Sequence, residues 1–196
     1  MHAPASPYRV RPARPGDARA IATVHVASWQ QAFAGLLPVR FLADLSVDRQ
    51  TDNWSAWIAG PPTHHVLVVE TEGDAGAEGA AAGDGAGRAR SAIVGLAQAG
   101  PSRDGDAPPG TGELYTLYLL ADTWNLGVGK LLHDAVLTHL SEDGHHRVTL
   151  WVLGTNTRAR NFYQRRGWRQ VAGERTQEFG GSVVTDYRYG RPLPAG

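Results

Sequence analysis

The sequence predicts one α/β (α+β) domain with a mixed, mostly antiparallel sheet of about seven strands and about four helices. Two observations predict it: antiparallel strands come first, and a strand–helix–strand–helix unit follows at 113–166. A helix of about four turns between two strands forces those strands to be parallel. At 196 residues the chain fits one domain, 1–196, and is too short for two comfortable ones.

The first half predicts a strand, two or three helical segments and a strand pair. Residues 8–14 alternate in character, which predicts a strand, and apolar residues then recur at helical spacing from Asp17, the expected N-cap, to about residue 36. Residues 41–58 predict one or two further helical pieces. Residues 64–72 and 91–100 predict two paired strands.

Two segments do not fit this pattern of regular elements. Gly73–Arg90, "GDAGAEGAAAGDGAGRAR", is nearly all glycine, alanine and charge. Such a composition buries too little surface to offset its chain entropy, so it predicts a flexible surface loop joining the two strands. Residues 1–7 predict a disordered tail.

The second half predicts alternating strands and helices. Strands are expected at 113–120 and 147–153, helices at 129–142 and 157–166, and closing strands at 170–178 and 183–189. In parallel sheets, ligands bind at the carboxyl ends of neighbouring strands, where a helix begins. We therefore expect the functional site at the central parallel pair.

Composition excludes several classes of function. Lys+Arg and Asp+Glu number 19 each, so no net field attracts nucleic acid or an anionic membrane. The absence of cysteine excludes disulfides, thiolate metal sites and a cysteine nucleophile. The eight histidines have no metal-ligand spacing, so no metal is expected. With neither a signal peptide nor an apolar run of about 18 residues, a cytoplasmic location is the default expectation.

A glycine pair stands where the first of these parallel strands meets its helix. Gly127 and Gly129 allow positive φ and a close approach to the main chain, and the free amides of a helix N-terminus attract an anion, most often a phosphate. A Walker A loop is excluded because Leu131 follows Gly129-Lys130, and a dinucleotide fingerprint is excluded because residue 132 is leucine. A plain tight turn remains the alternative.

The next helix decides between a phosphate-binding loop and a plain tight turn. Its segment fits the pattern N-x-x-A-x-x-F-Y-x-x-x-G-[FWY] at Asn156, Ala159, Phe162, Tyr163, Gly167 and Trp168. Together with the glycine loop, which fits [RQ]-x-x-G-x-G/A apart from Trp124 at its first position, this block resembles the GNAT superfamily of acetyl-CoA-dependent N-acetyltransferases. The resemblance extends from Tyr8 onward and implies a splayed central pair of parallel strands. Trp124 removes a polar contact to the pyrophosphate.

The resemblance implies acetyl-CoA as co-substrate. Its pantetheine would pair with the backbone of one strand, its pyrophosphate would lie on the loop amides, Lys130 would offer a point charge, and an arginine of the basic patch at 158–169 would meet the nucleotide's 3′-phosphate. The residues expected to bind it are Leu117, Tyr118, Leu119, Asn125, Leu126, Gly127, Val128, Gly129, Lys130, Asn156 and Arg160. Asn156 could instead only cap its helix.

The resemblance also implies the chemistry: direct attack by a primary amine of a small molecule or peptide, without a covalent enzyme intermediate. Tyr163 would be the general acid toward sulfur, and Glu113 the base, directly or through water. The plain alternatives are a core tyrosine and a solvated strand residue. The acceptor would lie among Trp29, Phe33, Trp54 and Trp57, facing 178–187. A non-catalytic acyl-CoA sensor on the same fold is the competing function, and a homodimer stays open as an assembly.

Overall fold

The computed structural model describes residues 6–72 and 91–194. The loop predicted at Gly73–Arg90 and residues 1–5 of the predicted tail lie outside the described residues. Of that tail, Pro7 is described, and its carbonyl oxygen accepts a hydrogen bond of 2.7 Å from the Glu72 amide.

The described residues form seven strands and five α-helices, which confirms the predicted class; the segment at 41–58, predicted as one or two helical pieces, contributes to two of the helices. The strands are β1 (Tyr8–Pro12), β2 (His65–Thr71), β3 (Ile93–Pro101), β4 (Thr111–Leu119), β5 (Arg147–Leu153), β6 (Arg169–Phe179) and β7 (Ser182–Pro192). The helices are α1 (Ala18–Ala32), α2 (Val39–Ala43), α3 (Val47–Ile58), α4 (Val128–Glu142) and α5 (Thr157–Gln164).

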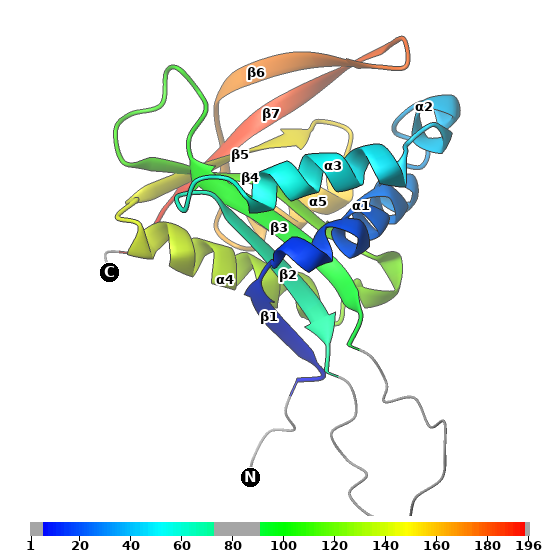
Figure 1. Ribbon diagram of the computed structural model, residues 1–196. Helices are drawn as coiled ribbons and strands as arrows, with labels where there is room; N and C mark the ends of the chain where they lie inside the picture. Colours follow the sequence, from blue (N-terminus) through cyan, green and yellow to red (C-terminus); the bar gives the residue numbers. More distant parts are fainter. Residues whose placement is uncertain (1–5, 73–90, 195–196) are drawn as a thin grey trace, which may run out of the picture.

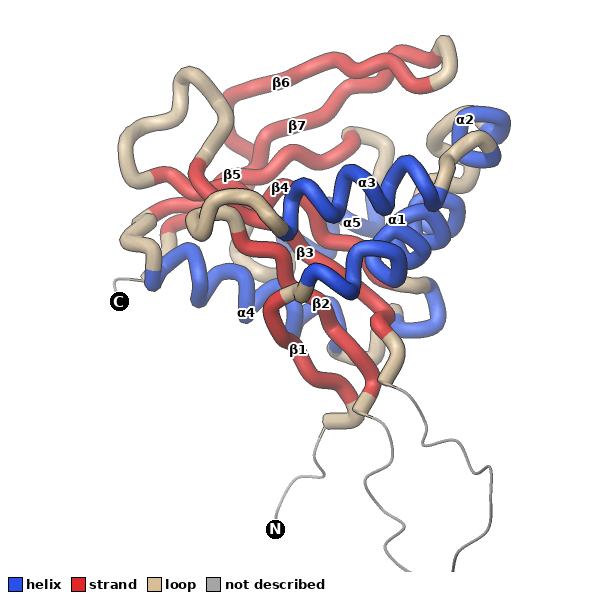
Figure 2. The backbone as a smooth tube through the Cα atoms, viewed as in Figure 1, coloured by secondary structure: helices blue, strands red, loops and turns tan. Residues whose placement is uncertain are grey.

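The seven strands form one sheet in the order β1-β2-β3-β4-β5-β7-β6. Every neighbouring pair is antiparallel except β4 and β5, which are parallel as predicted. Helices α1 and α3 cover one face of the sheet and α4 covers the other (Figures 1 and 2). The β6–β7 hairpin extends past the covered part of the sheet, and its tip meets α2: Gly180 of the hairpin turn contacts Phe41.

The two-sided cover explains why β2 has a continuous apolar sequence. Leu67 and Val69 pack in the same core as α4, whereas Val66 and Val68 pack in the core that α1 forms with α3. A strand buried on both faces loses the usual alternation of apolar and polar residues. The sheet therefore holds its central strands rigidly between two cores, and β4 is one of them.

Asp17 does not cap α1 with its side chain as the sequence predicted. It stands at the N-cap position, but its carboxylate accepts from the Arg14 amide at 2.7 Å and pairs with Arg11 at 2.7 Å. Both partners precede Asp17, so the side chain closes the short 3-10 turn before α1 and ties it to β1. This geometry leaves no oxygen aimed at the amides of α1.

Candidate active site

The parallel pair separates along its length. Hydrogen-bonded register joins β4 to β5 only at 111–113 and 147–149. Beyond these residues β4 stays paired to β3, and β5 stays paired to β7, so residues 114–119 have no described strand on the β5 side. This confirms the splayed central pair and leaves one edge of β4 with unpaired backbone groups.

A β-bulge in β4 lies where the strands part. Thr116 pairs with Gln98 and Leu114 with Ala99, so Tyr115 has no partner on β3. A bulge of this kind bends the strand and shifts its side-chain alternation by one. As a result Leu114 and Leu117 both lie in the core on the α4 side.

The glycine loop has the conformation of an anion-binding turn. Asn125 and Gly127 both have left-handed φ, 64° and 84°, and α4 begins directly afterwards. The first hydrogen bond into α4 runs from the Leu131 amide to the Gly127 carbonyl, so the amides just before Leu131 have no partner within the helix. Alternating backbone conformations that turn several amides inward form a nest for anions.

The two glycines serve different purposes. Gly127 supplies the positive φ, whereas Gly129 belongs to the first turn of α4 and is buried. A Cβ on Gly129 would lie 3.0 Å from the Phe162 ring and 3.1 Å from Leu119. Gly129 thus lets the start of α4 pack closely against α5 and β4.

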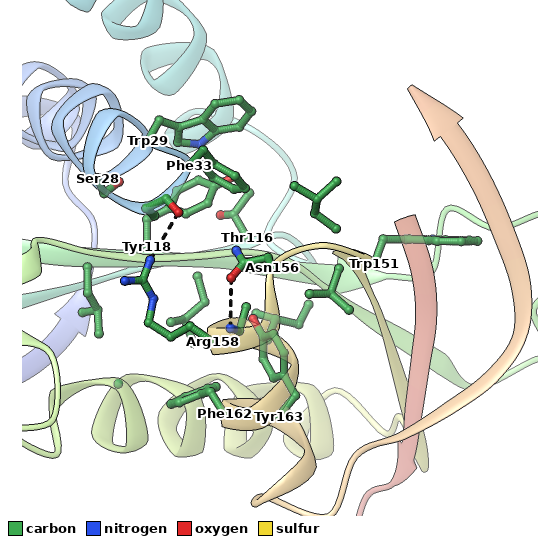
Figure 3. Close-up of a pocket in the computed structure, with 18 of the residues that line it drawn as sticks. Ser28, Trp29, Phe33, Thr116, Tyr118, Trp151, Asn156, Arg158, Phe162 and Tyr163 are labelled. Carbon is green, nitrogen blue, oxygen red and sulfur yellow. Dashed lines mark hydrogen bonds between the residues drawn. The ribbon is translucent and has the colours of Figure 1, made fainter. Parts of the chain in front are cut away.

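One cavity of about 600 Å³ runs from this loop, between the separated strands, to the β6–β7 hairpin. Figure 3 shows Tyr163 and Phe162 of α5, with Asn156 at the N-cap of that helix, on one side and Tyr118, Phe33 and Trp29 on the other. Of the residues predicted from the sequence, the cavity is lined by Leu117, Tyr118, Leu119, Asn125, Gly127, Gly129, Lys130, Asn156 and Tyr163. Leu126, Val128, Arg160 and Glu113 do not line it.

Asn156 caps α5 and also lines the cavity. Its Oδ1 accepts from the Ala159 amide at 3.1 Å, and no described residue binds its Nδ2 group. The side chain thus combines capping with a free donor (Figure 3).

Arg160 is turned away from the cavity. Its Nε donates to the Tyr189 hydroxyl at 3.1 Å and its Nη1 to the Gly154 carbonyl at 2.9 Å. Three other arginines of the same basic patch line the cavity instead: Arg158, Arg165 and Arg166. The Arg158 guanidinium reaches across to α1, where it donates to the Ala32 carbonyl at 3.2 Å (Figure 3).

Tyr163 is buried at the inner wall of the cavity. Its ring packs edge-on against Phe162 and Trp168, with centroid distances of 5.2 and 5.7 Å. Burial raises the pKa of its phenol, so the hydroxyl keeps its proton at neutral pH. No described residue makes a hydrogen bond to this hydroxyl. The geometry leaves a protonated phenol facing the cavity.

Glu113 is buried with both oxygens in use. Oε1 accepts from the Arg103 guanidinium and Oε2 from the Arg103 amide, both at 2.9 Å. The carboxylate is 2% exposed and holds the 102–110 loop against β4. It is not the solvated strand residue of the plain alternative.

The aromatic side chains predicted near the acceptor divide into two groups. Trp29 and Phe33 line the cavity, together with Trp151 and Phe179, which the sequence did not single out. Trp54 and Trp57 do not line it: Trp54 donates to His25 Nδ1 at 3.1 Å in the core between α1 and α3. At the hairpin end of the cavity, Asp186 lies within the predicted range 178–187 but was not singled out, and Arg175 lies outside that range. A single charge within a strand pattern gives no sign of facing inward.

Family comparison agrees with this site. The sequence model of the Acetyltransferase (GNAT) family matches residues 29–168, which include the glycine loop and both parallel strands. The chain belongs to the GNAT acetyltransferase family. The uncharacterised N-acetyltransferase YuaI of Bacillus subtilis is 28% identical over 148 residues, 75% of this chain and 72% of that protein. A probable N-acetyltransferase of Mycobacterium tuberculosis is 24% identical, over 97% of this chain and 98% of its own length.

Solved structures show the same GNAT fold. The PaiA N-acetyltransferase of Thermoplasma acidophilum, in complex with coenzyme A, has a TM-score of 0.68 at 15% identity, over 94% of this chain and 98% of that one. YncA of Salmonella typhimurium, a putative acetyltransferase with acetyl-CoA, has a TM-score of 0.66 at 17% identity, over 97% and 96%. Within the described part of this chain, no helix is long and apolar enough to cross a membrane, and no group of three potential metal ligands comes together.

Proposed function

We propose that this GNAT protein transfers the acetyl group of acetyl-CoA to a primary amine of a small molecule or peptide. One observation carries the proposal: the anion-binding loop, the unpaired edge of β4 and the buried Tyr163 phenol all border the same cavity. A bound acetyl-CoA would supply the activated acetyl thioester. The chain would supply binding, orientation and a proton.

The residues present suit such a ligand along its length. The amides at the start of α4, Lys130 and the lining arginines suit phosphates. Lys130 pairs at 2.6 Å with Asp134, but the pair is exposed and therefore weak. The unpaired backbone of β4 and the free Nδ2 group of Asn156 suit the amides of a pantetheine arm. Thr116 Oγ1, a buried polar atom without a partner among the described residues, lies on the same wall.

Tyr163 would donate a proton to the departing thiolate. A phenol is protonated at neutral pH, and burial raises the pKa of Tyr163 further, so it is in the acid form; its ring is fixed by Phe162 and Trp168. Direct attack by the amine fits the composition, because the sequence holds no cysteine to carry an acetyl group. Glu113 could act as base only by leaving Arg103, so we assign it a structural role.

A thiol-release assay with acetyl-CoA and a panel of amines, amino acids and peptides tests the proposal. We expect turnover with at least one acceptor class. Binding of acetyl-CoA in a thermal-shift assay without turnover across the panel would support the non-catalytic sensor instead. Absence of both binding and turnover would contradict both functions.

A further inference from the structure

The hairpin end of the cavity carries one carboxylate and one guanidinium that the proposed acetyl transfer does not use. Asp186 of β7 is 6% exposed, and Arg175 is its register partner on β6. Arg175 Nε donates to Asp186 Oδ2 at 3.1 Å, and Gln177 Nε2 donates to the same oxygen. All three side chains line the cavity.

The carboxylate of Asp186 can accept further hydrogen bonds. Both of its hydrogen bonds go to Oδ2, and no described residue donates to Oδ1. An ionised carboxylate accepts about four hydrogen bonds when fully satisfied. Burial, and to a lesser degree the negative charge of Asp186, raises the pKa of Tyr118 to about 12, so the field of this carboxylate reaches β4 across the cavity. Asp186 can therefore receive a donor inside the cavity.

Arg175 likewise has free donors. Its guanidinium carbon lies 4.7 Å from the centroid of the Trp151 ring, and its Nη1 and Nη2 donate to no described residue. A planar guanidinium with two free Nη groups offers a carboxylate two parallel hydrogen bonds. The pair with Asp186 uses only Nε, so this second interaction requires no rearrangement of the pair.

An apolar wall lies at the same end of the cavity. Trp29, Phe33 and Phe179 line it, and the ring centroid of Trp29 is 4.9 Å from that of Phe33 and 5.9 Å from that of Phe179. Among the described lining residues, the remaining charged side chains come from α4, α5 and the turn that follows α5: Lys130, Arg158, Arg165 and Arg166. The hairpin end thus offers an apolar surface beside one negative and one positive group.

We propose that the acceptor is an α-amino acid with an apolar or aromatic side chain. Its amino group donates to Asp186 Oδ1, and its carboxylate accepts from the Nη groups of Arg175. Its side chain lies on the apolar wall described above. The inference deepens the proposed acetyl transfer and rests on it. A zwitterion places each charge beside the opposite one, whereas a simple amine would leave the free side of Arg175 without an anion.

The test compares three acceptors that share the 2-phenylethylamine skeleton: phenylalanine, phenylalanine amide and 2-phenylethylamine itself. The corresponding leucine series is tested in parallel. In the wild-type protein we expect kcat/KM for the amino acid to exceed that of the amide and of the amine by at least about tenfold. Arg175→Gln should abolish this preference by lowering only the amino-acid value. Asp186→Asn should lower kcat/KM for all three acceptors by about tenfold or more.

The acetyl-CoA dissociation constant should stay unchanged in both variants, which separates an acceptor role from a fold defect. Arg147→Gln, at the exposed start of β5 and outside the cavity lining, is the matched control and should behave as wild type. Equal use of amine and amino acid by the wild-type protein would overturn the inference without need of any variant, as would acetylation confined to polyamines or peptides. Lack of turnover with every acceptor class would overturn the proposed function itself.

Discussion

The guanidinium of Arg158 stacks on the indole of Trp124, with its carbon 3.5 Å from the ring centroid. Trp124 occupies the loop position where the GNAT pattern has arginine or glutamine, so the sequence suggested a lost contact to the pyrophosphate. The structure places a cation at this point from a different element, α5. Stacking on the indole and the bond to Ala32 fix its position.

Arg158→Gln should therefore weaken acetyl-CoA binding. Loss of one partly desolvated cation near phosphates is expected to raise the dissociation constant about tenfold and to reduce its salt dependence. Isothermal titration at two salt concentrations measures both effects. Arg40→Gln on the exposed face of α2 is the control. An unchanged acetyl-CoA dissociation constant in Arg158→Gln would show that the stacked Arg158–Trp124 pair only closes the cavity wall between α5 and α1.

Leu126 gives a clean test of the glycine loop. Its side chain is 59% exposed, so Leu126→Asp adds a negative charge beside the expected phosphates without disturbing the core, whereas Gly129 has no room for a side chain. Acetyl-CoA at about a hundred times its dissociation constant should stabilise the wild-type protein by about 2.7 kcal/mol. We expect thermal unfolding to show most of this gain lost in Leu126→Asp and kept in Leu126→Asn. A full gain in the aspartate variant would place the nucleotide elsewhere.

Tyr163→Phe removes the proposed general acid and keeps the ring that packs against Phe162 and Trp168. We expect kcat to fall about a hundredfold, with the KM for acetyl-CoA little changed. Steady-state kinetics measure both constants. Tyr118→Phe is the comparison, because Tyr118 also presents a buried phenol to the cavity. If only the Tyr118 variant loses activity, the acid has been misassigned, and Tyr163 is a core residue.

His25 should make stability depend on pH. Burial lowers its pKa from 6.5 to about 4, and its Nδ1 accepts from Trp54. Below pH 6.5 the unfolded chain binds a proton at His25, whereas the folded protein binds it only near pH 4. The neutral, buried His25 therefore makes its full contribution to the unfolding free energy above pH 6.5, and this contribution is lost as the pH falls toward 4. At about 1.4 kcal/mol per pKa unit, the full loss is about 3 kcal/mol.

His25→Asn keeps an acceptor for the Trp54 N–H and removes the titrating group. Between pH 7 and pH 4.5, the fall in unfolding free energy should be about 2 kcal/mol smaller in this variant than in wild type, as measured by urea unfolding. His146→Asn, at an exposed position, serves as the control. If the unfolding free energy falls equally in wild type and His25→Asn, another group causes the loss of stability at low pH.

The sequence by itself determined the order and type of the elements. Apolar periodicity located the strands and helices to within a few residues, because burial of one face or two leaves a regular local pattern. The length of the helix at 128–142 required β4 and β5 to be parallel, and this was confirmed. The glycine loop and the pattern from Asn156 to Trp168 are short segments whose function lies in their own backbone and spacing, and they identified the family.

The tertiary structure decided which side chains face the cavity. Glu113 is tied to Arg103 by the path of the 102–110 loop, and Arg160 is bound by Tyr189 because β7 lies beside β5. Asp186 reaches the cavity because β7 is inserted between β5 and β6. Local patterns carry no information on such partners, since a charged side chain is directed by whichever group tertiary packing places within reach, and that group is set by the strand order of the sheet.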